Sequence, residues 1–249
     1  MSLAPDNLLP INAKYFGFID TNRTYNPEYD IVWSFQYAIS GTEAGFATFL
    51  TNSPPNSGLF PGQYLGCTST IAFLNTEGGD IITTESDEPI EIDGGISFNT
   101  AFSIAFDSTG LFALSSEYRT GVTRDLVKPN SLIIRDGSNN IALNAQLSAL
   151  NTRFCLLSSA KRYSTIRIRY TNMSNVRVDF KLDGDTNYTN LTSVYLPVNT
   201  TTFSAVNIGF SYSSPVSSTT NPSVLFFKNF HTEGVTTGTT VETVPFVSL

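Results

Sequence analysis

The chain has few charged side chains and little of the chemistry that many enzymes need. Only 14% of its 249 residues are charged, against about 25% in an average soluble protein. The single histidine, His231, excludes a metal site built from several histidines, and we expect it to be a surface or hydrogen-bonded residue near a strand end. Glycine-rich phosphate-binding motifs and a Gly-x-Ser-x-Gly nucleophile elbow are absent from the sequence. These absences disfavour nucleotide-dependent and serine-hydrolase chemistry.

Positive charge is also scarce. The 14 lysines and arginines stand against 21 aspartates and glutamates, so the net charge is −7. Binding to a phosphate backbone needs clustered cations, and we therefore expect no nucleic-acid partner. The densest basic run contains Lys161, Arg162, Arg167 and Arg169. We interpret its alternating members as one solvent face of a strand rather than as a phosphate-binding site.

Long hydrophobic runs are missing as well. No window of about 18 apolar residues is present, so we expect no membrane insertion. The N-terminus shows no signal peptide, although Met1 to Leu3 resemble a vector-derived start and are set aside. Serine, threonine and asparagine take the place of charge, as in many β-rich secreted or virion proteins. We therefore expect an extracellular or virion-surface location.

Cysteine is too rare for a disulfide framework. Cys67 and Cys155 are the only two in the chain, and both lie in apolar segments typical of strands. We interpret them as two buried free thiols, and a single disulfide is the alternative.

What the sequence does contain, from end to end, is the period-two alternation of β-strands. Asp136-Gly137 and Asp183-Gly184 supply residues suited to hairpin turns. Residues 141–150 fit either a strand or a short helix. The predicted strands are 31–39, 45–50, 96–106, 110–117, 131–135, 154–158, 164–170, 176–182, 205–212 and 223–232.

No linker, change in composition or internal repeat divides the chain. The sequence therefore predicts a single all-β domain over residues 1–249. Residues 4–32 supply an N-terminal strand and loops, and residues 235–249 supply an edge strand or a loose tail. Ten or more strands imply two stacked antiparallel sheets, in a chain too long for an immunoglobulin-sized sandwich.

A set of motifs follows in a fixed order between Trp33 and Gly234. The motifs are the strand Ala-Gly-Phe-Ala-Thr-Phe-Leu (44–50), the loop Phe-Pro-Gly-Gln-Tyr-Leu-Gly (60–66), and the segments 104–108, 165–170, 176–180, 206–211 and 225–231. In this order they resemble the legume (L-type) lectin superfamily of concanavalin A-like proteins, in a divergent form. The resemblance implies an all-β, concanavalin A-like jelly-roll sandwich of two large antiparallel sheets.

The metal site of that family is not carried over. The family holds Ca²⁺ and a transition metal with several carboxylates, an asparagine and a histidine, and hard Ca²⁺ requires six or more oxygens. Only Asp107 matches, because the other ligand positions fall on Ala105, Thr109, Leu111, Ser116 and Gly121. We therefore expect no metal and no cofactor. The loop 183–187 has alternating oxygen donors, but it lacks a flanking glutamate, and we interpret it as a hairpin turn.

The sugar-binding aspartate of the family is also replaced, here by Ala44, with Glu43 beside it as a substitute if the loop shifts by one residue. One glycine of the second loop becomes Gln63. Phe60 and Tyr64 on that loop are candidates for stacking against a sugar ring. The ligand-binding residues that the resemblance implies are Glu43, Ala44, Phe60, Gly62, Gln63, Tyr64 and Asp107.

We interpret the chain as a carbohydrate-binding or adhesion module that acts without metal, and as a binding protein rather than an enzyme. Its implied partner is a glycan or a cell-surface polysaccharide, and the sequence is also compatible with a homo-oligomer. One alternative is a virion structural or host-recognition protein, because the chain resembles marine phage proteins in composition. The other is a glycan hydrolase or lyase. For that activity Glu85, Asp87 and Glu91 are the nearest carboxylates, but their spacing and Pro89 fit an exposed acidic loop better.

Overall fold

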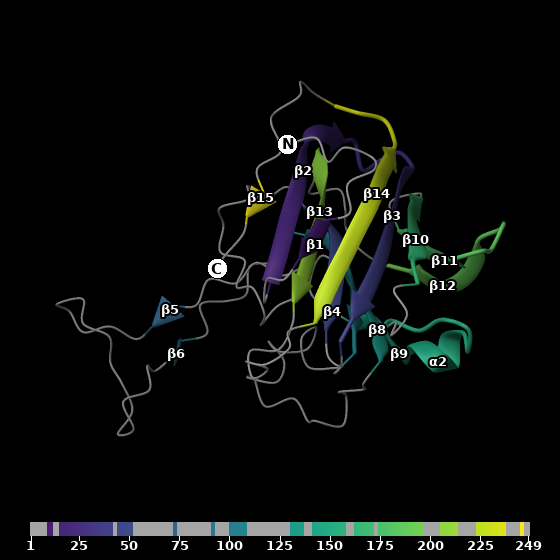
Figure 1. Cartoon of the computed structure of the whole chain (residues 1–249). Helices are drawn as coiled ribbons and strands as arrows, with labels where there is room; N and C mark the ends of the chain where they lie inside the picture. The colour runs from purple at the N-terminus through teal and green to yellow at the C-terminus, as the bar shows by residue number, and fades with distance from the viewer. Residues whose placement is uncertain are drawn as a thin grey trace.

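A computed structural model describes most of the chain, and its regular structure is almost entirely β (Figure 1). The described residues are 9–11, 15–41, 44–51, 72–73, 91–92, 100–108, 130–136, 141–157, 162–171, 174–196, 205–213, 223–237 and 245–246. The elements are β1 (Leu9–Ile11), β2 (Tyr15–Tyr25), β3 (Ile31–Ser40), β4 (Gly45–Thr51), β5 (Ala72–Phe73), β6 (Glu91–Ile92), β7 (Thr100–Asp107), β8 (Ser131–Asp136), β9 (Ile141–Gln146), α2 (Leu147–Leu150), β10 (Ser164–Thr171), β11 (Asn175–Leu182), β12 (Thr189–Tyr195), β13 (Val206–Ser213), β14 (Val224–Glu233) and β15 (Pro245–Phe246).

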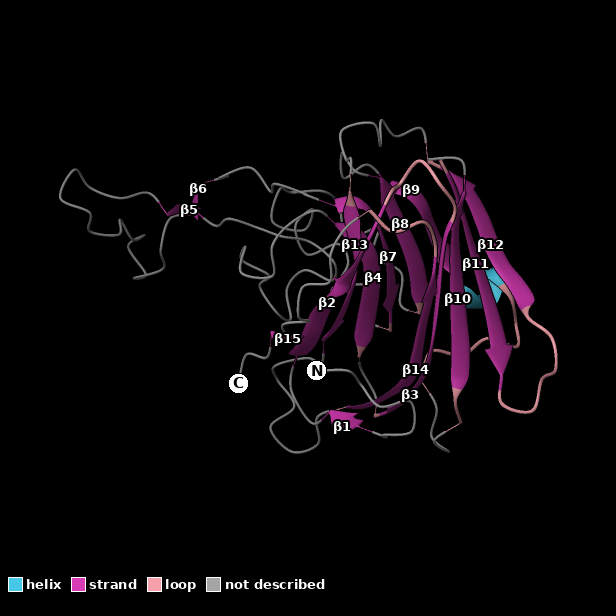
Figure 2. Ribbon diagram, turned by 90° about the horizontal axis from the view of Figure 1, so that it is seen from above, coloured by secondary structure: helices cyan, strands magenta, loops and turns pink. Residues whose placement is uncertain are grey.

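Two antiparallel sheets stack face to face (Figure 2). Sheet A has six strands in the order β1-β14-β3-β10-β11-β12, and sheet B has seven in the order β15-β2-β13-β4-β7-β8-β9. Strands β5 and β6 pair with each other alone. The predicted fold class, an all-β sandwich of two large antiparallel sheets, is confirmed.

The core between the sheets is built from inward-facing aromatic side chains. On β3 every second residue is fully buried, and the ring of Phe35 reaches across to sheet B. Its centroid lies 5.7 Å from that of Phe46 on β4 and 5.4 Å from that of Phe210 on β13, both edge to face. Edge-to-face pairs at this spacing are attractive beyond their burial of area. The two sheets are therefore joined through the alternate residues of their central strands.

Trp33 occupies the core, as the sequence predicts, and its polar atom is satisfied there. The indole Nε1–H donates to Thr48 Oγ1 of β4 at 2.8 Å, and the Thr48 hydroxyl donates to the carbonyl oxygen of Gly209 at 2.9 Å. All three groups are buried, where an unpaired polar atom would cost about 1–3 kcal/mol. Thr48 thus faces sheet A, and its neighbour Phe49 faces the opposite side of sheet B.

Both side edges of the sandwich are closed by polar contacts between the sheets. At one edge, Arg153 Nη2 donates to Asp185 Oδ1 at 2.8 Å, which joins the loop after α2 to the β11–β12 hairpin. At the other edge, the Tyr25 hydroxyl of β2 donates to Thr232 Oγ1 of β14 at 2.6 Å. The predicted hairpin turn at residues 183–187 is confirmed, because β11 and β12 pair on either side of it and Gly184 has φ +86°.

Several local predictions need correction or completion. Residues 154–157, the described part of the predicted strand 154–158, do not form a strand: Phe154 and Leu156 are buried and Cys155 is exposed, but these residues pair with no strand among those described. The strand β12 was not predicted, because its polar sequence TNLTSVY hides the alternation. Residues 141–150 form both alternatives in succession, β9 and then the single turn α2. The predicted strand 110–117 lies outside the described residues.

No helix in the described part of the chain is long and apolar enough to span a bilayer.

Candidate ligand-binding site

Two of the residues implicated by sequence, Ala44 and Asp107, meet at one end of sheet B. Gly45, which opens β4, is in register with Asp107 at the end of β7. The Ala44 N–H donates to Ser108 Oγ at 2.8 Å, and the Ser108 N–H donates to the Ala44 carbonyl oxygen at 3.0 Å. Ala44 and Asp107 are both fully buried, so they support this end of the sheet from within. Glu43, Phe60, Gly62, Gln63 and Tyr64 lie outside the described residues.

The same end continues across β8 and β9 as one row of backbone contacts. Asp107 is in register with Ser131, and Ser131 with Gln146. One residue further out, the Asn130 N–H donates to the Ser108 carbonyl oxygen at 3.0 Å, and the Leu147 N–H donates to the Asn130 carbonyl oxygen at 2.7 Å. Asn130 adopts φ +51°, a left-handed conformation that asparagine tolerates better than most residues. These backbone contacts hold Asn130 and Gln146 side by side at the end of the β8–β9 hairpin, where both residues are exposed.

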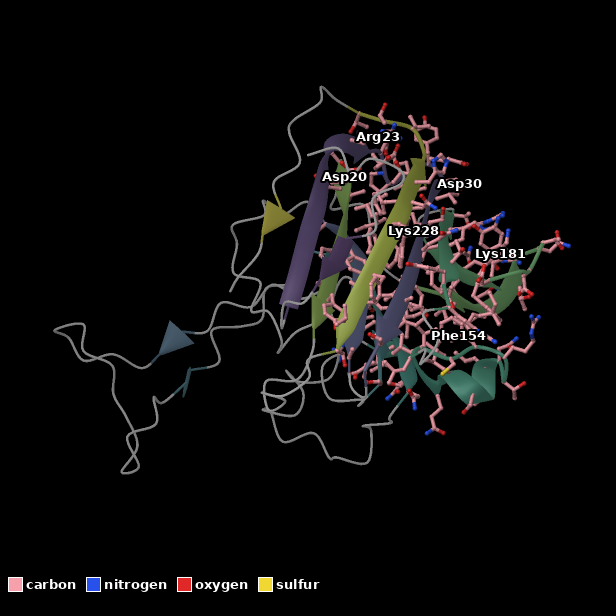
Figure 3. The ribbon with its side chains drawn as sticks, in the orientation of Figure 1. Asp20, Arg23, Asp30, Phe154, Lys181 and Lys228 are labelled. Carbon is pink, nitrogen blue, oxygen red and sulfur yellow. The ribbon has the colours of Figure 1, made fainter. Side chains whose placement is uncertain are left out.

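A pocket of about 230 Å³ opens beside this row, and we call it the end pocket. Its base is apolar and buried, and consists of Leu147, Phe154 and Leu156. Its rim is exposed and consists of Asn130, Gln146, Ser148 and Cys155. Figure 3 shows Phe154 beside α2. Amide and hydroxyl groups above an apolar base suit a small ligand that has both hydroxyl groups and an apolar face.

Phe154 ties the base of the end pocket to both sheets. Its ring centroid lies 5.9 Å from that of Phe106 on β7 and 5.1 Å from that of Phe180 on β11. The base is therefore part of the hydrophobic core and is held in place by it. A base fixed in this way lowers the cost of ordering a site when a ligand binds.

The prediction of a buried Cys155 is wrong, because this cysteine is an exposed free thiol on the rim. Its Sγ donates to the Leu157 carbonyl oxygen at 3.0 Å. The apolar neighbours Phe154 and Leu156 misled the prediction, since they take the inward positions and leave Cys155 facing out. Cys67 lies outside the described residues.

Sequence reasoning missed the rim of the end pocket. Asn130, Gln146 and Ser148 belong to residue types that are common throughout this chain, so nothing in their type marks them. The only signal is positional: Pro129-Asn130 precedes a predicted strand, and Gln146 falls within the segment that fits both a strand and a helix.

A cluster of charges lies on the outer face of sheet A, centred on Asp179. Asp179 on β11 is fully buried and accepts hydrogen bonds from Arg177 Nε at 2.7 Å and from Arg167 Nη2 at 2.8 Å. Arg169 Nε lies farther from the carboxylate, 3.8 Å from Asp179 Oδ2. The prediction that Arg167 and Arg169 share the solvent face of a strand is confirmed, since β10 alternates between buried and half-buried residues.

Asp179 stays ionised despite its burial. Burial on its own would raise the pKa of this carboxyl, but hydrogen bonds from Arg177, Arg167 and Asn190 act against it, and the pKa falls below its usual value. The pKa of Asp185 is also lowered, chiefly by the hydrogen bond from Arg153. The predicted position of His231 near a strand end is confirmed: it is exposed, and its Nε2 lies 3.0 Å from Glu233 Oε1.

Among the residues that the structure describes, no three His, Cys, Asp or Glu side chains gather in a way that could hold a metal ion.

No protein-family model matches the sequence, and no curated protein matches it. Solved structures do match in fold. The exoplasmic/lumenal domain of VIP36, solved with Ca²⁺ and Man3GlcNAc, is 10% identical, with a TM-score of 0.49 over 96% of this chain and 81% of that one. Lectin I-B4 from Griffonia simplicifolia, in a metal-free form, is 13% identical, with a TM-score of 0.41 over 82% of this chain and 72% of that one.

The alginate lyase A1-II′, a member of polysaccharide lyase family 7, is 8% identical, with a TM-score of 0.38 over 84% of this chain and 64% of that one. The comparisons give no support to a phage origin. These likenesses, all with TM-scores below 0.5, are to lectins and to a lyase. The predicted sandwich of two stacked antiparallel sheets is confirmed by the strand pairing of this chain itself.

Proposed function

We propose that the chain is a carbohydrate-binding module and that its primary site is the end pocket. The observation that carries this proposal is the arrangement of the lining: exposed amides and a hydroxyl stand around a buried apolar base. A sugar ring has the matching chemistry, because hydroxyl groups surround its edge while its axial C–H groups form an apolar face. Amide groups can donate to and accept from such hydroxyls at the same time.

The size of the end pocket favours a single sugar residue at its base. Pockets for drug-sized ligands measure roughly 300–1,000 Å³, and the end pocket, at about 230 Å³, falls below that range. A terminal sugar or one ring of a longer chain would fit, and the rest of a glycan would extend over the rim.

The loop residues implicated by sequence extend the proposal beyond the pocket itself. Glu43 adjoins Ala44, whose N–H donates to the Ser108 hydroxyl and whose carbonyl oxygen accepts from the Ser108 N–H at this end of sheet B. We assign Glu43, Phe60, Gly62, Gln63 and Tyr64 to the same binding region, with the rings of Phe60 and Tyr64 stacking on sugar. We also assign the protein to an extracellular or virion-surface location, where cell-surface glycans are found.

Glycan-array screening followed by titration calorimetry of the strongest glycan tests the proposal. Asn130→Gly removes one rim amide without backbone strain, and Gln146→Ala removes the other. The loss of one hydrogen bond to a ligand corresponds to about 1 kcal/mol, so each variant is expected to bind roughly fivefold more weakly. Asn229→Gly is the matched control, because Asn229 is also an exposed asparagine with positive φ but lies on β14.

A second pair of variants tests the loop assignment. Phe60→Ala and Tyr64→Ala are expected to weaken binding, and EDTA is expected to leave it unchanged. The proposal is wrong if no glycan binds, if the rim variants bind as the parent does, or if the protein depolymerises a panel of polysaccharides. In the last case Glu85→Gln and Asp87→Asn would show whether those carboxylates carry the reaction.

A further inference from the structure

The cluster around Asp179 carries more positive charge than it needs. Arg167, Arg169, Arg177 and Lys181 all occupy the outer face of β10 and β11, and Asp179 is the carboxylate among them. Four cations around one carboxylate give a formal charge of +3, although the whole chain carries −7. The remainder of the chain therefore carries −10, and the cluster is a local electropositive surface on an acidic protein.

Two arginines of the cluster face each other across the strands. Arg169 on β10 is in register with Arg177 on β11, and their side chains are 42% and 51% exposed. Like charges directly opposite each other destabilise a sheet. Arg177 is compensated by its hydrogen bond to Asp179, whereas Arg169 Nε lies 3.8 Å from Asp179 Oδ2, within ion-pair range but beyond hydrogen-bond distance. An anion between the two guanidinium groups would relieve this repulsion.

The arginines are held ready for such a ligand. Asp179 fixes Arg167 and Arg177 by hydrogen bonds, and the Arg167 guanidinium also stacks over the ring of Tyr188, with Cζ 3.7 Å from the ring centroid. Fixed arginine forks bind carboxylates and sulfates through paired hydrogen bonds, and little side-chain entropy is then lost on binding. Lys181, labelled in Figure 3, adds a further positive charge at the hairpin end of β11.

Hydroxyl groups are neighbours of the cluster on this face. Ser34 on β3 is in register with Arg167, Ser193 on β12 with Arg177, and Thr165 on β10 with Lys181. Beyond β3, the strand β14 adds Lys228, His231 and Glu233 to the same face. The hydroxyl groups of Ser34, Thr165 and Ser193 can hydrogen-bond to the hydroxyls of a sugar chain but contribute no charge. A polymer that carries hydroxyl groups beside each anionic group therefore matches the face better than one that offers charge alone.

We propose that the outer face of sheet A binds an acidic polysaccharide, whose carboxylate or sulfate groups lie between Arg169 and Arg177. The geometry disfavours single-stranded nucleic acid, which depends on aromatic rings open to base stacking. Three described tyrosines lie on this face, and two of them are covered by cations: Arg167 lies over Tyr188, and Lys228 Nζ lies 4.0 Å from the ring centroid of Tyr163. Tyr195 on β12 is 66% exposed, so a nucleic acid would find one open ring rather than a series of rings for successive bases. This site is distinct from the end pocket and does not depend on it.

Affinity electrophoresis and calorimetry of the full chain test this proposal with four probes. Polygalacturonate supplies carboxylates, dextran sulfate supplies sulfates, dextran is the neutral comparison, and a single-stranded DNA oligonucleotide is the nucleic-acid comparison. We expect one or both acidic polysaccharides to bind, with an affinity that falls as salt is raised, and dextran not to bind at this face. Which of the two acidic polymers binds more tightly identifies the anionic group.

Single-charge variants locate the site. Arg169→Gln and Lys181→Gln are expected to weaken binding about tenfold each. The arginines that donate hydrogen bonds to Asp179 are Arg167 and Arg177, so the fold is expected to persist in both variants. Arg23→Gln on β2 removes the same charge from sheet B, where Arg23 donates to Thr232, and is expected to bind as the parent does. Asn130→Gly, in the end pocket, is also expected to leave this binding unchanged.

The proposal is overturned if neither acidic polysaccharide binds, if DNA binds more tightly than both, or if Arg169→Gln and Lys181→Gln bind like Arg23→Gln. Should Arg169→Gln fail to fold, Lys181→Gln decides the question alone. Failure of the end-pocket proposal would appear in the Asn130→Gly and Gln146→Ala variants and would leave these results untouched.

Discussion

Sheets A and B are built from different kinds of strand, although both bury one face in the same core. On β4 all seven residues are buried, and β8 is buried throughout as well. On β10 buried and half-buried residues alternate without exception. The central part of sheet B is therefore covered on both faces, whereas the outer face of sheet A is open to solvent. A covered face selects small or apolar residues, and an open face is free to carry charge.

The difference explains where charged and polar groups can act. The outer face of sheet A holds five arginines and lysines on β10, β11 and β14, among hydroxyl and amide side chains. On β4 and β7 of sheet B, Phe49, Ser103 and Ala105 point away from sheet A and are at most 3% exposed. The ligand contacts that we propose for sheet B are accordingly at the strand ends, where the end pocket opens.

The strongest test of this comparison is Phe49→Ala. Phe49 points away from the shared core, yet it is only 2% exposed, so its loss should cost as much as the loss of a core phenylalanine, about 3–5 kcal/mol of unfolding free energy. Urea denaturation of parent and variant measures the effect. A cost below 1 kcal/mol would mean that the second face of sheet B is open in solution.

Asp179→Asn is expected to have the next largest effect. This variant leaves three arginines on sheet A without their anionic partner, and removal of one member of a buried ion pair costs about 3 kcal/mol or more. The same denaturation experiment applies, with Asp185→Asn as control, because Asp185 pairs with Arg153 on a more exposed part of the surface. Equal stability of the two variants would contradict the central role given to Asp179.

The pH dependence of stability should follow from the same carboxyl group. The pKa of Asp179 is lower in the folded protein than the value of about 3.9 expected in the unfolded chain. Its contribution is therefore complete above that unfolded value and is lost as the pH falls through the folded pKa. We expect the gap in unfolding free energy between parent and Asp179→Asn to be wide at pH 6 and to narrow below about pH 4. A difference in unfolding free energy that stays constant with pH would contradict this explanation.

Thr165→Ala should have the smallest effect. Thr165 is half-buried on the open face of sheet A, so the variant loses strand propensity and leaves no cavity, at a cost of about 1 kcal/mol or less. Thermal unfolding monitored by circular dichroism is sensitive enough to compare it with Phe49→Ala. Similar losses of stability in the two variants would contradict the distinction between the covered outer face of sheet B and the open outer face of sheet A.

Much of the fold was predictable from the sequence, because alternation is a direct consequence of strand geometry. The segment Ser164–Thr171 alternates so regularly that its boundaries and its solvent face followed at once. The polar strand Thr189–Tyr195 escaped, since only Leu191 is buried there and its pairing with β11 contains a register shift. Phe154 and Leu156 led to the prediction of a strand that is absent, because two buried residues separated by one exposed residue also occur in a loop.

The candidate sites were less predictable. Ala44 and Asp107 were placed together by the resemblance to lectins, and the register of β4 and β7 brings them together. Asn130 precedes β8 and Gln146 ends β9, so the two rim residues are separated in sequence by the whole hairpin. Their proximity depends on the pairing of β8 with β9, which no local pattern reveals. Asp179 was visible only as one polar residue in an alternating strand. Arg167 is its partner through cross-strand register, whereas Arg177 lies two residues earlier on the same strand and Arg169 is in register with Arg177.

Glycine 209 lies directly beneath the ring of Phe49, since a Cβ built on it would fall 2.1 Å from a ring carbon. The two positions are in register on β13 and β4. Gly209 is therefore not free to vary alone, because a side chain at position 209 requires a smaller one at position 49. Any attempt to redesign this face of the sandwich should treat the pair as a single unit of substitution.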